Sequence, residues 1–121
     1  MQLLLLRNTN YDLSMSIKVA IEDIGKRIDE YGSSAFVITM TEEGKAKIVH
    51  TLISLEKGSI ICSPGKGTIK NLIHSSSVSF LFPPNSESGL SMIIDGIGQI
   101  KDLEKDSIKV EVTGGVLHRP A

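Results

Sequence analysis

The chain has 121 residues, of which 40% are hydrophobic and 22% are charged, and its formal net charge is −1. This size and composition suit one globular domain with its own core, so we expect a single domain over residues 1–121. The nearly neutral charge excludes the strongly basic footprint typical of nucleic-acid-binding proteins, and the lone cysteine, Cys62, excludes an intrachain disulfide and favours a cytoplasmic location.

The first apolar run, Leu3–Leu6, is too short for a signal-peptide core of roughly 7–15 residues, and no basic stretch precedes it. No run in the chain approaches the ~20 apolar residues that a membrane-spanning helix needs. We therefore expect no membrane partner, and we interpret Leu3–Leu6 as a short strand or as a segment that packs on a partner.

Residues 13–31 carry apolar side chains at helical spacing. Successive apolar positions are three or four residues apart, at Leu13, Ile17, Ile21, Ile24, Ile28 and Tyr31. Such spacing places them on one face of a helix, and Gly32 follows as a natural C-terminal stop. The pattern predicts an amphipathic N-terminal helix over residues 13–31.

After Gly32 the apolar pattern becomes typical of β-strands. The predicted strands cover residues 33–40, 45–55, 59–63, 78–82, 90–101 and 107–113, and the predicted short helix, after the third strand, covers residues 68–75. Gly96 and Gly98 indicate a bulge or bend in the fifth strand, and residues 114–121 are expected to form a tail. Short turns favour antiparallel pairing, and six such strands are expected to close into a barrel.

The turn between the third strand and the short helix, Ser63–Thr68, combines glycines, a lysine and hydroxyl groups. Small residues before a helix let backbone N–H groups approach a phosphate. The nucleotide P-loop pattern fails here, since Gly67 follows Lys66 where serine or threonine is needed, and the dinucleotide fingerprint fails at Lys70. Two interpretations stay open: a weak phosphate site, or a plain loop in which Thr68 caps the helix.

Sites of other kinds have little support in the sequence. The histidines, His50, His74 and His118, share no helical spacing with one another, so we expect no metal site. His50 is expected to face the core or a partner, and Cys62 to be an inert buried side chain. No residue is identified as catalytic.

The succession of motifs from Phe36 to Lys101 resembles the pyridoxamine 5′-phosphate oxidase-like superfamily of flavin-binding split barrels. The segments that carry the resemblance are FVITMTEEGKAKIVH, EKGSIICSPGKGTIKNLIHSSSVSFLFPP and IIDGIGQIK. Within them, Asn71-Leu72, the run Val78–Pro83 and Gly96-Ile97-Gly98 match the order and spacing of the family pattern. The resemblance implies a mainly β fold, a six-stranded antiparallel split β-barrel of Greek-key type with peripheral helices.

The resemblance also implies a homodimer that binds FMN, or a related deazaflavin, in a cleft between the two barrels. It places Lys66, Thr68 and Lys70 nearest the flavin phosphate, and Ser63 near the phosphate or ribityl chain. Thr51 on the second strand and Ser91 on the fifth are secondary cofactor-binding candidates. The tail residues His118, Arg119 and Pro120 imitate a basic C-terminal residue of the oxidases, or they form a frayed end.

Several positions depart from the oxidase pattern. The places of the phosphate-binding arginine and lysine on the second strand hold Val49 and Ser54, and an Arg-Lys pair after the third strand falls on Gly67 and Thr68. Authentic pyridoxamine phosphate oxidase activity is therefore not expected. The resemblance predicts a flavin-binding protein, with oxidoreductase activity on an unknown small substrate as one interpretation; the alternative is a flavin-free dimeric binding module that holds another anionic ligand or a protein partner.

Overall fold

The computed structural model describes residues 16–86 and 89–119. The helical elements are a 3₁₀ turn, η1 (Ile21–Asp23), and the α-helices α2 (Ile24–Tyr31) and α3 (Lys66–His74). The strands are β1 (Ser16–Val19), β2 (Ser34–Met40), β3 (Ala46–Glu56), β4 (Ser59–Cys62), β5 (Ser77–Phe82), β6 (Ser91–Asp102) and β7 (Ser107–His118).

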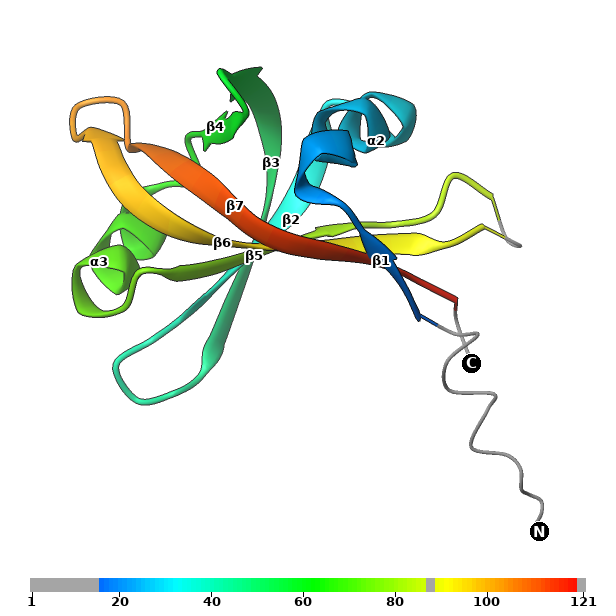
Figure 1. Cartoon of the computed structure of the whole chain (residues 1–121). Helices are drawn as coiled ribbons and strands as arrows, with labels where there is room; N and C mark the ends of the chain where they lie inside the picture. The colour runs from blue at the N-terminus through cyan, green and yellow to red at the C-terminus, as the bar shows by residue number, and fades with distance from the viewer. Residues whose placement is uncertain (1–15, 87–88, 120–121) are drawn as a thin grey trace, which may run out of the picture.

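The strands form one antiparallel sheet that closes on itself. Their order is β1-β7-β4-β3-β2-β5-β6, and a further pairing joins β6 to β7. Strands β2 to β7 therefore make a six-stranded barrel, and β1 adds to its outside along β7 (Figure 1). This arrangement confirms the predicted mainly β split barrel.

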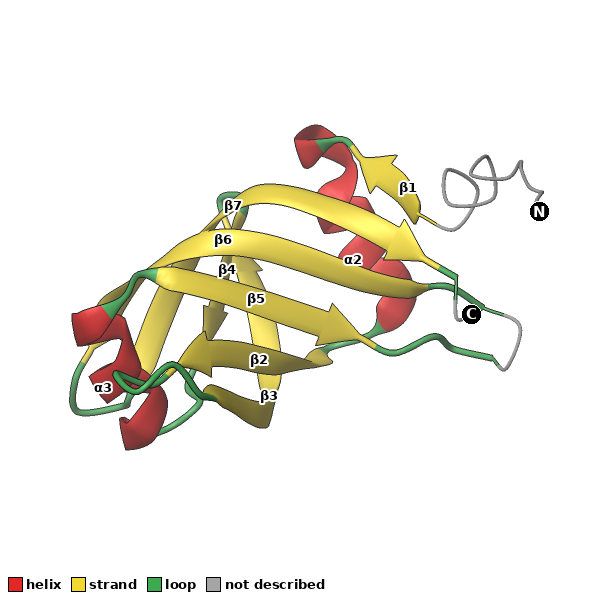
Figure 2. Ribbon diagram, turned by 90° about the horizontal axis from the view of Figure 1, so that it is seen from below, coloured by secondary structure: helices red, strands yellow, loops and turns green. Residues whose placement is uncertain are grey.

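Strand β7 is shared between two partners on one of its edges. Its first half pairs with β4 through Ile108–Val110, and its second half pairs with β1 through Gly115–His118. Its other edge pairs with β6 along nearly its whole length. Strands β6 and β7, of twelve residues each, are therefore the longest pair in the sheet and lie side by side (Figure 2).

The two α-helices lie near opposite ends of the barrel (Figure 1). Helix α2 buries Ile24 and Ile28 in the core. Helix α3 buries Leu72 and Asn71, and the Leu72 side chain lies so close to Gly98 that a Cβ there would be 3.0 Å from Leu72 Cδ2. The predicted irregularity in this strand is confirmed, since the β6–β7 register shifts between Asp95 and Gly96.

The helix predicted over residues 13–31 is wrong in its first half. Residues Ser16–Val19 form β1, and the α-helix begins only at Ile24. Ile17 and Ile21, which a continuous helix would bury, are 50% and 56% exposed. The β-branched stretch pairs with β7 instead. This pairing satisfies main-chain groups on the edge of β7 that a helix, which bonds within itself, would leave unpaired.

The tail predicted from residue 114 is also wrong, because β7 continues to His118. Two adjacent glycines suggested the end of the strand, but Gly115 has a packing role. A Cβ at Gly115 would lie 3.3 Å from Ile24 Cδ1, so glycine lets α2 approach the strand closely. Leu3–Leu6 and Pro120 lie outside the described residues. Within the described ranges, no helix is long and apolar enough to cross a membrane.

Candidate functional site

A cavity of about 510 Å³, which we call the β3 cavity, lies where β3 and β4 diverge. Strand β3 pairs with β4 only from Ile53 to Glu56, because β4 is four residues long and β3 is eleven. Among the residues that the structure describes, no strand pairs with the rest of β3 on that edge. The cavity is lined by residues 50–54 of β3 and by 61–63 at the exit of β4. Two of the predicted ligand residues, Thr51 and Ser63, are therefore brought together here.

The free edge of β3 presents main-chain groups to this cavity. The Ile53 N–H donates to the Ser33 carbonyl, on the side of β2, at 2.8 Å. Successive residues of a strand direct their N–H and C=O groups to opposite edges. The main-chain groups of His50 and Leu52 consequently face the cavity, where β4 is no longer alongside. The Thr51 hydroxyl donates to the Leu52 carbonyl at 3.2 Å, which leaves that oxygen a second lone pair.

The side chains around the cavity are mostly uncharged. The His50 ring stacks on Phe36 with 4.7 Å between centroids, and its Nε2 is 3.1 Å from Ser34 Oγ. His50 is exposed on the outer face of the barrel. Cys62 is buried, and burial raises the pKa of its thiol to about 12, so it is a poor nucleophile near neutral pH, as the sequence predicts.

Helix α3 begins directly after the cavity. Its N-cap residue, Gly65, has φ 110°, a conformation that other residues rarely adopt. The Thr68 side chain is buried, and its Oγ1 has no hydrogen-bond partner among the described residues. Lys66 is 88% exposed at its side chain, with its Nζ 3.8 Å from Asp106 Oδ1.

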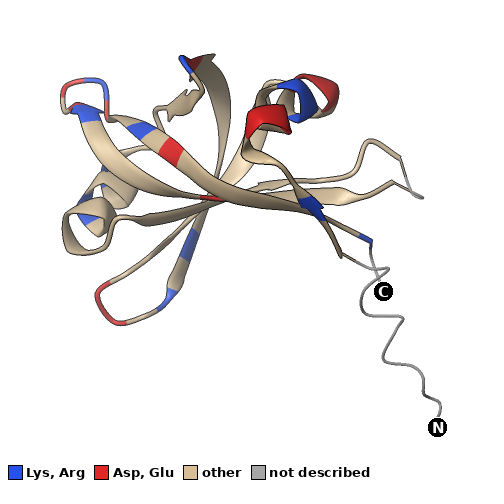
Figure 3. Ribbon diagram, in the orientation of Figure 1, with Lys and Arg blue, Asp and Glu red and all other residues tan. Residues whose placement is uncertain are grey.

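Lys70 lies beside a different hollow from the one that holds Thr51 and Ser63. This hollow, of about 250 Å³, lies between α3 and the β2–β3 turn. Its lining carries charges of both signs, from Glu42, Glu43, Lys47 and Lys70. Figure 3 shows charged residues on several turns, on both α-helices and on parts of the strands.

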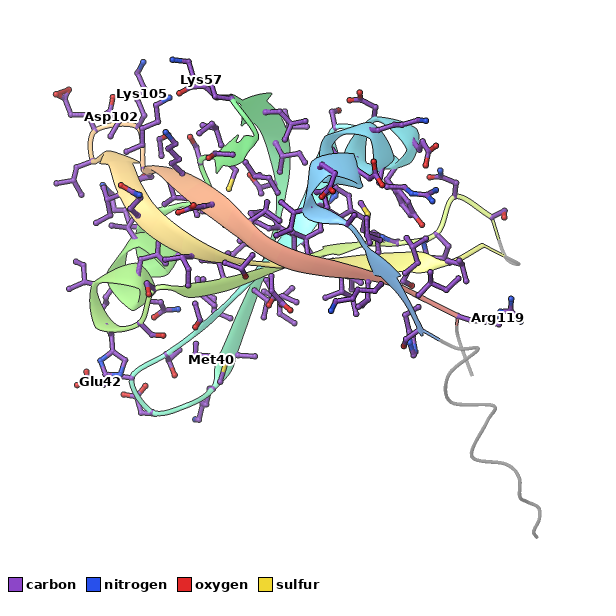
Figure 4. The ribbon with its side chains drawn as sticks, viewed as in Figure 1. Met40, Glu42, Lys57, Asp102, Lys105 and Arg119 are labelled. Carbon is purple, nitrogen blue, oxygen red and sulfur yellow. The ribbon has the colours of Figure 1, made fainter. Side chains whose placement is uncertain are left out.

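Ser91 is not brought to the cavity within one chain. It is the first residue of β6 and pairs with His118 of β7, whereas α3 packs near Gly98, further along β6. Arg119 lies at the same end as Ser91, away from Glu42 and the β2–β3 turn (Figure 4). His118 Nδ1 is 3.2 Å from Ser16 Oγ, so this part of the expected tail is ordered by β1.

The described part of the chain contains no group of three or more His, Cys, Asp or Glu residues placed to hold a metal ion. The sequence did not identify the main-chain edge at His50 and Leu52, or Ser54, as part of a site. Every residue type except proline supplies the same main-chain N–H and C=O groups, so no residue type marks such an edge in the sequence. The only signal was the unequal length of the second and third predicted strands, which leaves part of the longer one without a neighbour.

No protein-family model and no curated protein matches this sequence. Solved structures do match its fold. A Listeria innocua protein named as a candidate pyridoxamine 5′-phosphate oxidase aligns with a TM-score of 0.65 at 11% identity, over 81% of this chain and 98% of that one. An FAD-binding protein from Mycobacterium smegmatis aligns with a TM-score of 0.60 at 15% identity, over 86% of this chain and 99% of that one.

A third similar structure binds a different group. A heme-binding protein from Mycobacterium smegmatis aligns with a TM-score of 0.59 at 12% identity, over 82% of this chain and 54% of that one. At such identities the likeness shows the fold, and the same fold carries more than one ligand.

Proposed function

Because this chain has the split-barrel fold of the pyridoxamine 5′-phosphate oxidase-like proteins, we propose that it binds FMN or a related flavin in the cavity beside β3. The observation that carries the proposal is the free main-chain edge at His50 and Leu52, which borders a cavity of about 510 Å³. The pyrimidine side of a flavin ring carries an N–H between two carbonyls. An unpaired strand edge offers alternating donors and acceptors that complement it.

The exit of β4 suits the ribityl phosphate. Ser63 and Thr51 supply hydroxyl groups at the cavity, and the N–H groups at the start of α3 follow within a few residues. Lys66, Thr68 and Lys70 stand on the first turns of that helix. A bound flavin would supply hydride transfer, and the chain would position the ring and exclude competing reactions on a small substrate.

One observation favours the alternative, a flavin-free binding module of the same fold. No lysine or arginine is among the described residues that line the β3 cavity. Lys66 is instead close to Asp106, and Lys70 borders another hollow. Ionic hydrogen bonds to a phosphate are roughly twice as strong as neutral ones, so this arrangement predicts weaker retention of FMN than a cavity lined by arginine would give.

We also propose that the chain forms a homodimer through the outer face of β3 and its neighbours. Ile48 and Leu52 point outward from β3 and are 60% and 74% exposed. Next to them, cross-strand pairing sets His50, Phe36, Leu81 and Ile93 in one row over four strands. A continuous apolar surface of this kind on a small barrel is typical of an interface. Ser91 lies away from the β3 cavity of its own chain. In a dimer it would contribute to the cofactor site of the second copy.

Thermal unfolding with and without FMN tests the flavin proposal. A ligand that binds only the folded chain raises Tm as its concentration rises above Kd. We expect FMN to raise Tm for the wild type and for Ser63→Thr, which keeps the hydroxyl. We expect Ser63→Glu to lose the effect, because its carboxylate would repel the phosphate. An unchanged Tm for the wild type at millimolar FMN would favour the flavin-free module.

A further inference from the structure

A second cavity, of about 360 Å³, lies on the other side of β3, between that strand and α2. We call it the α2 cavity. Its lining consists of Ile28, Asp29, Gly32, Ser33, Ile53, Ser54 and Leu55. It shares Ile53 and Ser54 with the β3 cavity. The two cavities therefore flank the same short segment of strand, and ligands bound in both would contact the same two residues.

Three of the seven residues that line the α2 cavity, Ile28, Ile53 and Leu55, have apolar side chains. Ile28 and Ile53 belong to the buried core and present their edges to the cavity. Leu55 is 39% exposed, and it lies against α2, since a Cβ at Gly25 would be 3.6 Å from Leu55 Cδ1. A planar apolar body therefore fits this space better than a strongly hydrated one.

Two main-chain groups of β3 face the cavity without a strand partner. Strand β2 begins at Ser34, opposite Leu52, and the last bond on this edge runs from the Ile53 N–H to the Ser33 carbonyl. The Ile53 C=O and the Leu55 N–H point to the same edge by strand alternation. Neither has a backbone hydrogen-bond partner there within the described ranges. Together they form an acceptor and a donor on the same edge of the strand.

The charge at the α2 cavity disfavours anions. Asp29 is the only ionisable residue among the described residues that line the cavity, and the carboxyl end of α2 at Gly32 adds the partial negative charge of a helix C-terminus. A ligand with a carboxylate or phosphate here would face like charge, whereas a neutral amide would not. This contrasts with the start of α3, where N–H groups and lysines favour an anion.

We propose that the α2 cavity binds a small uncharged ligand with a planar apolar body and a carboxamide or cyclic-imide edge, which pairs with the Ile53 C=O and the Leu55 N–H. Its role as the second reactant beside a bound flavin rests on the proposed function. The binding itself does not. The free edge is too short for an added β-strand, because α2 lies beside Leu55 and the turn to β4 follows Glu56.

The test uses the full ¹⁵N-labelled chain without flavin, titrated with benzamide and with benzoate, which match in shape and differ in charge. We expect benzamide to shift the amide signals of Ser33 and Leu55, and benzoate to bind at least tenfold more weakly. No benzamide shift at these residues, or equal binding of benzoate, would overturn the proposal. A separate FMN titration reads the amides of Ile61 and Ser63, so failure of the flavin proposal is visible independently.

Two variants sharpen the test. Leu55→Pro removes the proposed donor but no ladder bond, because this N–H faces away from β4. Leu55→Val is its control and retains the donor. We expect at least a tenfold loss of benzamide affinity in Leu55→Pro alone, and equal affinities in the two variants would refute the pairing. If Leu55→Pro does not fold, Asp29→Lys provides the test, because Asp29 is exposed. This variant should bind benzoate at least tenfold more tightly than the wild type. No gain in benzoate affinity would overturn the proposal.

Discussion

The Asn71 side-chain amide donates a hydrogen bond to the Thr39 hydroxyl across 3.0 Å, and both residues are buried. Thr39 belongs to β2 and Asn71 to α3, so this bond joins the barrel wall to the helix that follows the candidate site. Apolar packing does not fix the rotation of a helix as sharply as a buried polar pair does. We infer that the pair fixes the rotation of α3 about its axis, and so the direction of the N–H groups in its first turn.

Replacing Asn71 with leucine tests this structural role. The change keeps a similar volume but leaves the Thr39 hydroxyl without its donor in a buried place. We expect a loss of about 1–3 kcal/mol in the free energy of unfolding, measured by urea titration. The paired change Thr39→Val with Asn71→Leu should recover part of the loss. A loss in the double variant equal to the sum of the two single losses would show that the two residues act independently of each other.

The proposed dimer face gives a prediction with a matched control. Leu52 on β3 and Ile73 on α3 are both 74% exposed, but only Leu52 lies on the outer face of the barrel next to Phe36 and His50. We expect Leu52→Glu to elute near the 13.1 kDa of one chain and Ile73→Glu to elute near twice that mass, as the wild type should. A wild type that elutes as a monomer would remove the dimer proposal.

Most of the barrel could be predicted from the sequence because alternation, turns and glycines act locally. The β6 irregularity followed from Gly96, where a Cβ would lie 2.6 Å from the Glu111 carbonyl. The errors have a different origin. Residues Ser16–Val19 carry a helical repeat by coincidence, and only the distant edge of β7 decides their conformation. The pair Gly114-Gly115 indicates the start of a tail in the sequence, because Ile24, against which Gly115 packs, is remote in sequence.

The candidate site was predictable only where side chains carry the signal. Thr51 and Ser63 lie in one cavity, whereas Lys70 borders another. The free main chain at His50 and Leu52 follows from which strands pair and how far, and no residue type encodes that directly. Ser91 was placed by resemblance, and its distance along β6 from α3 became visible only once the strand register was known.

The lysines of α3 can be tested by comparing two flavins that differ only in the phosphate. Lys66→Ala with Lys70→Ala should weaken FMN binding about tenfold, equivalent to about 1.4 kcal/mol, because two positive charges on the helix that follows the proposed phosphate position are removed. Riboflavin affinity should not change, since it has no phosphate. Flavin fluorescence quenching measures both. If FMN and riboflavin respond equally to the double change, the lysines do not hold the phosphate.

The buried thiol of Cys62 gives a prediction about pH. Burial raises its pKa from 9.0 to about 12, so between these values the folded chain holds a proton that the unfolded chain has released. Stability should therefore fall as pH rises from about 9 towards 12. Cys62→Ala should show a smaller decline over the same range. Iodoacetamide should label the native thiol slowly at pH 8 and the urea-unfolded thiol much faster, and equal rates would show that the thiol is not buried.

The proposal that a flavin occupies the β3 cavity is tested most directly by an amide chemical-shift map of the ¹⁵N-labelled wild-type chain titrated with FMN. We predict the largest shifts at His50, Leu52, Ile61 and Ser63 and in the first turn of α3. Shifts confined to other residues, or none at millimolar FMN, would contradict the proposed site.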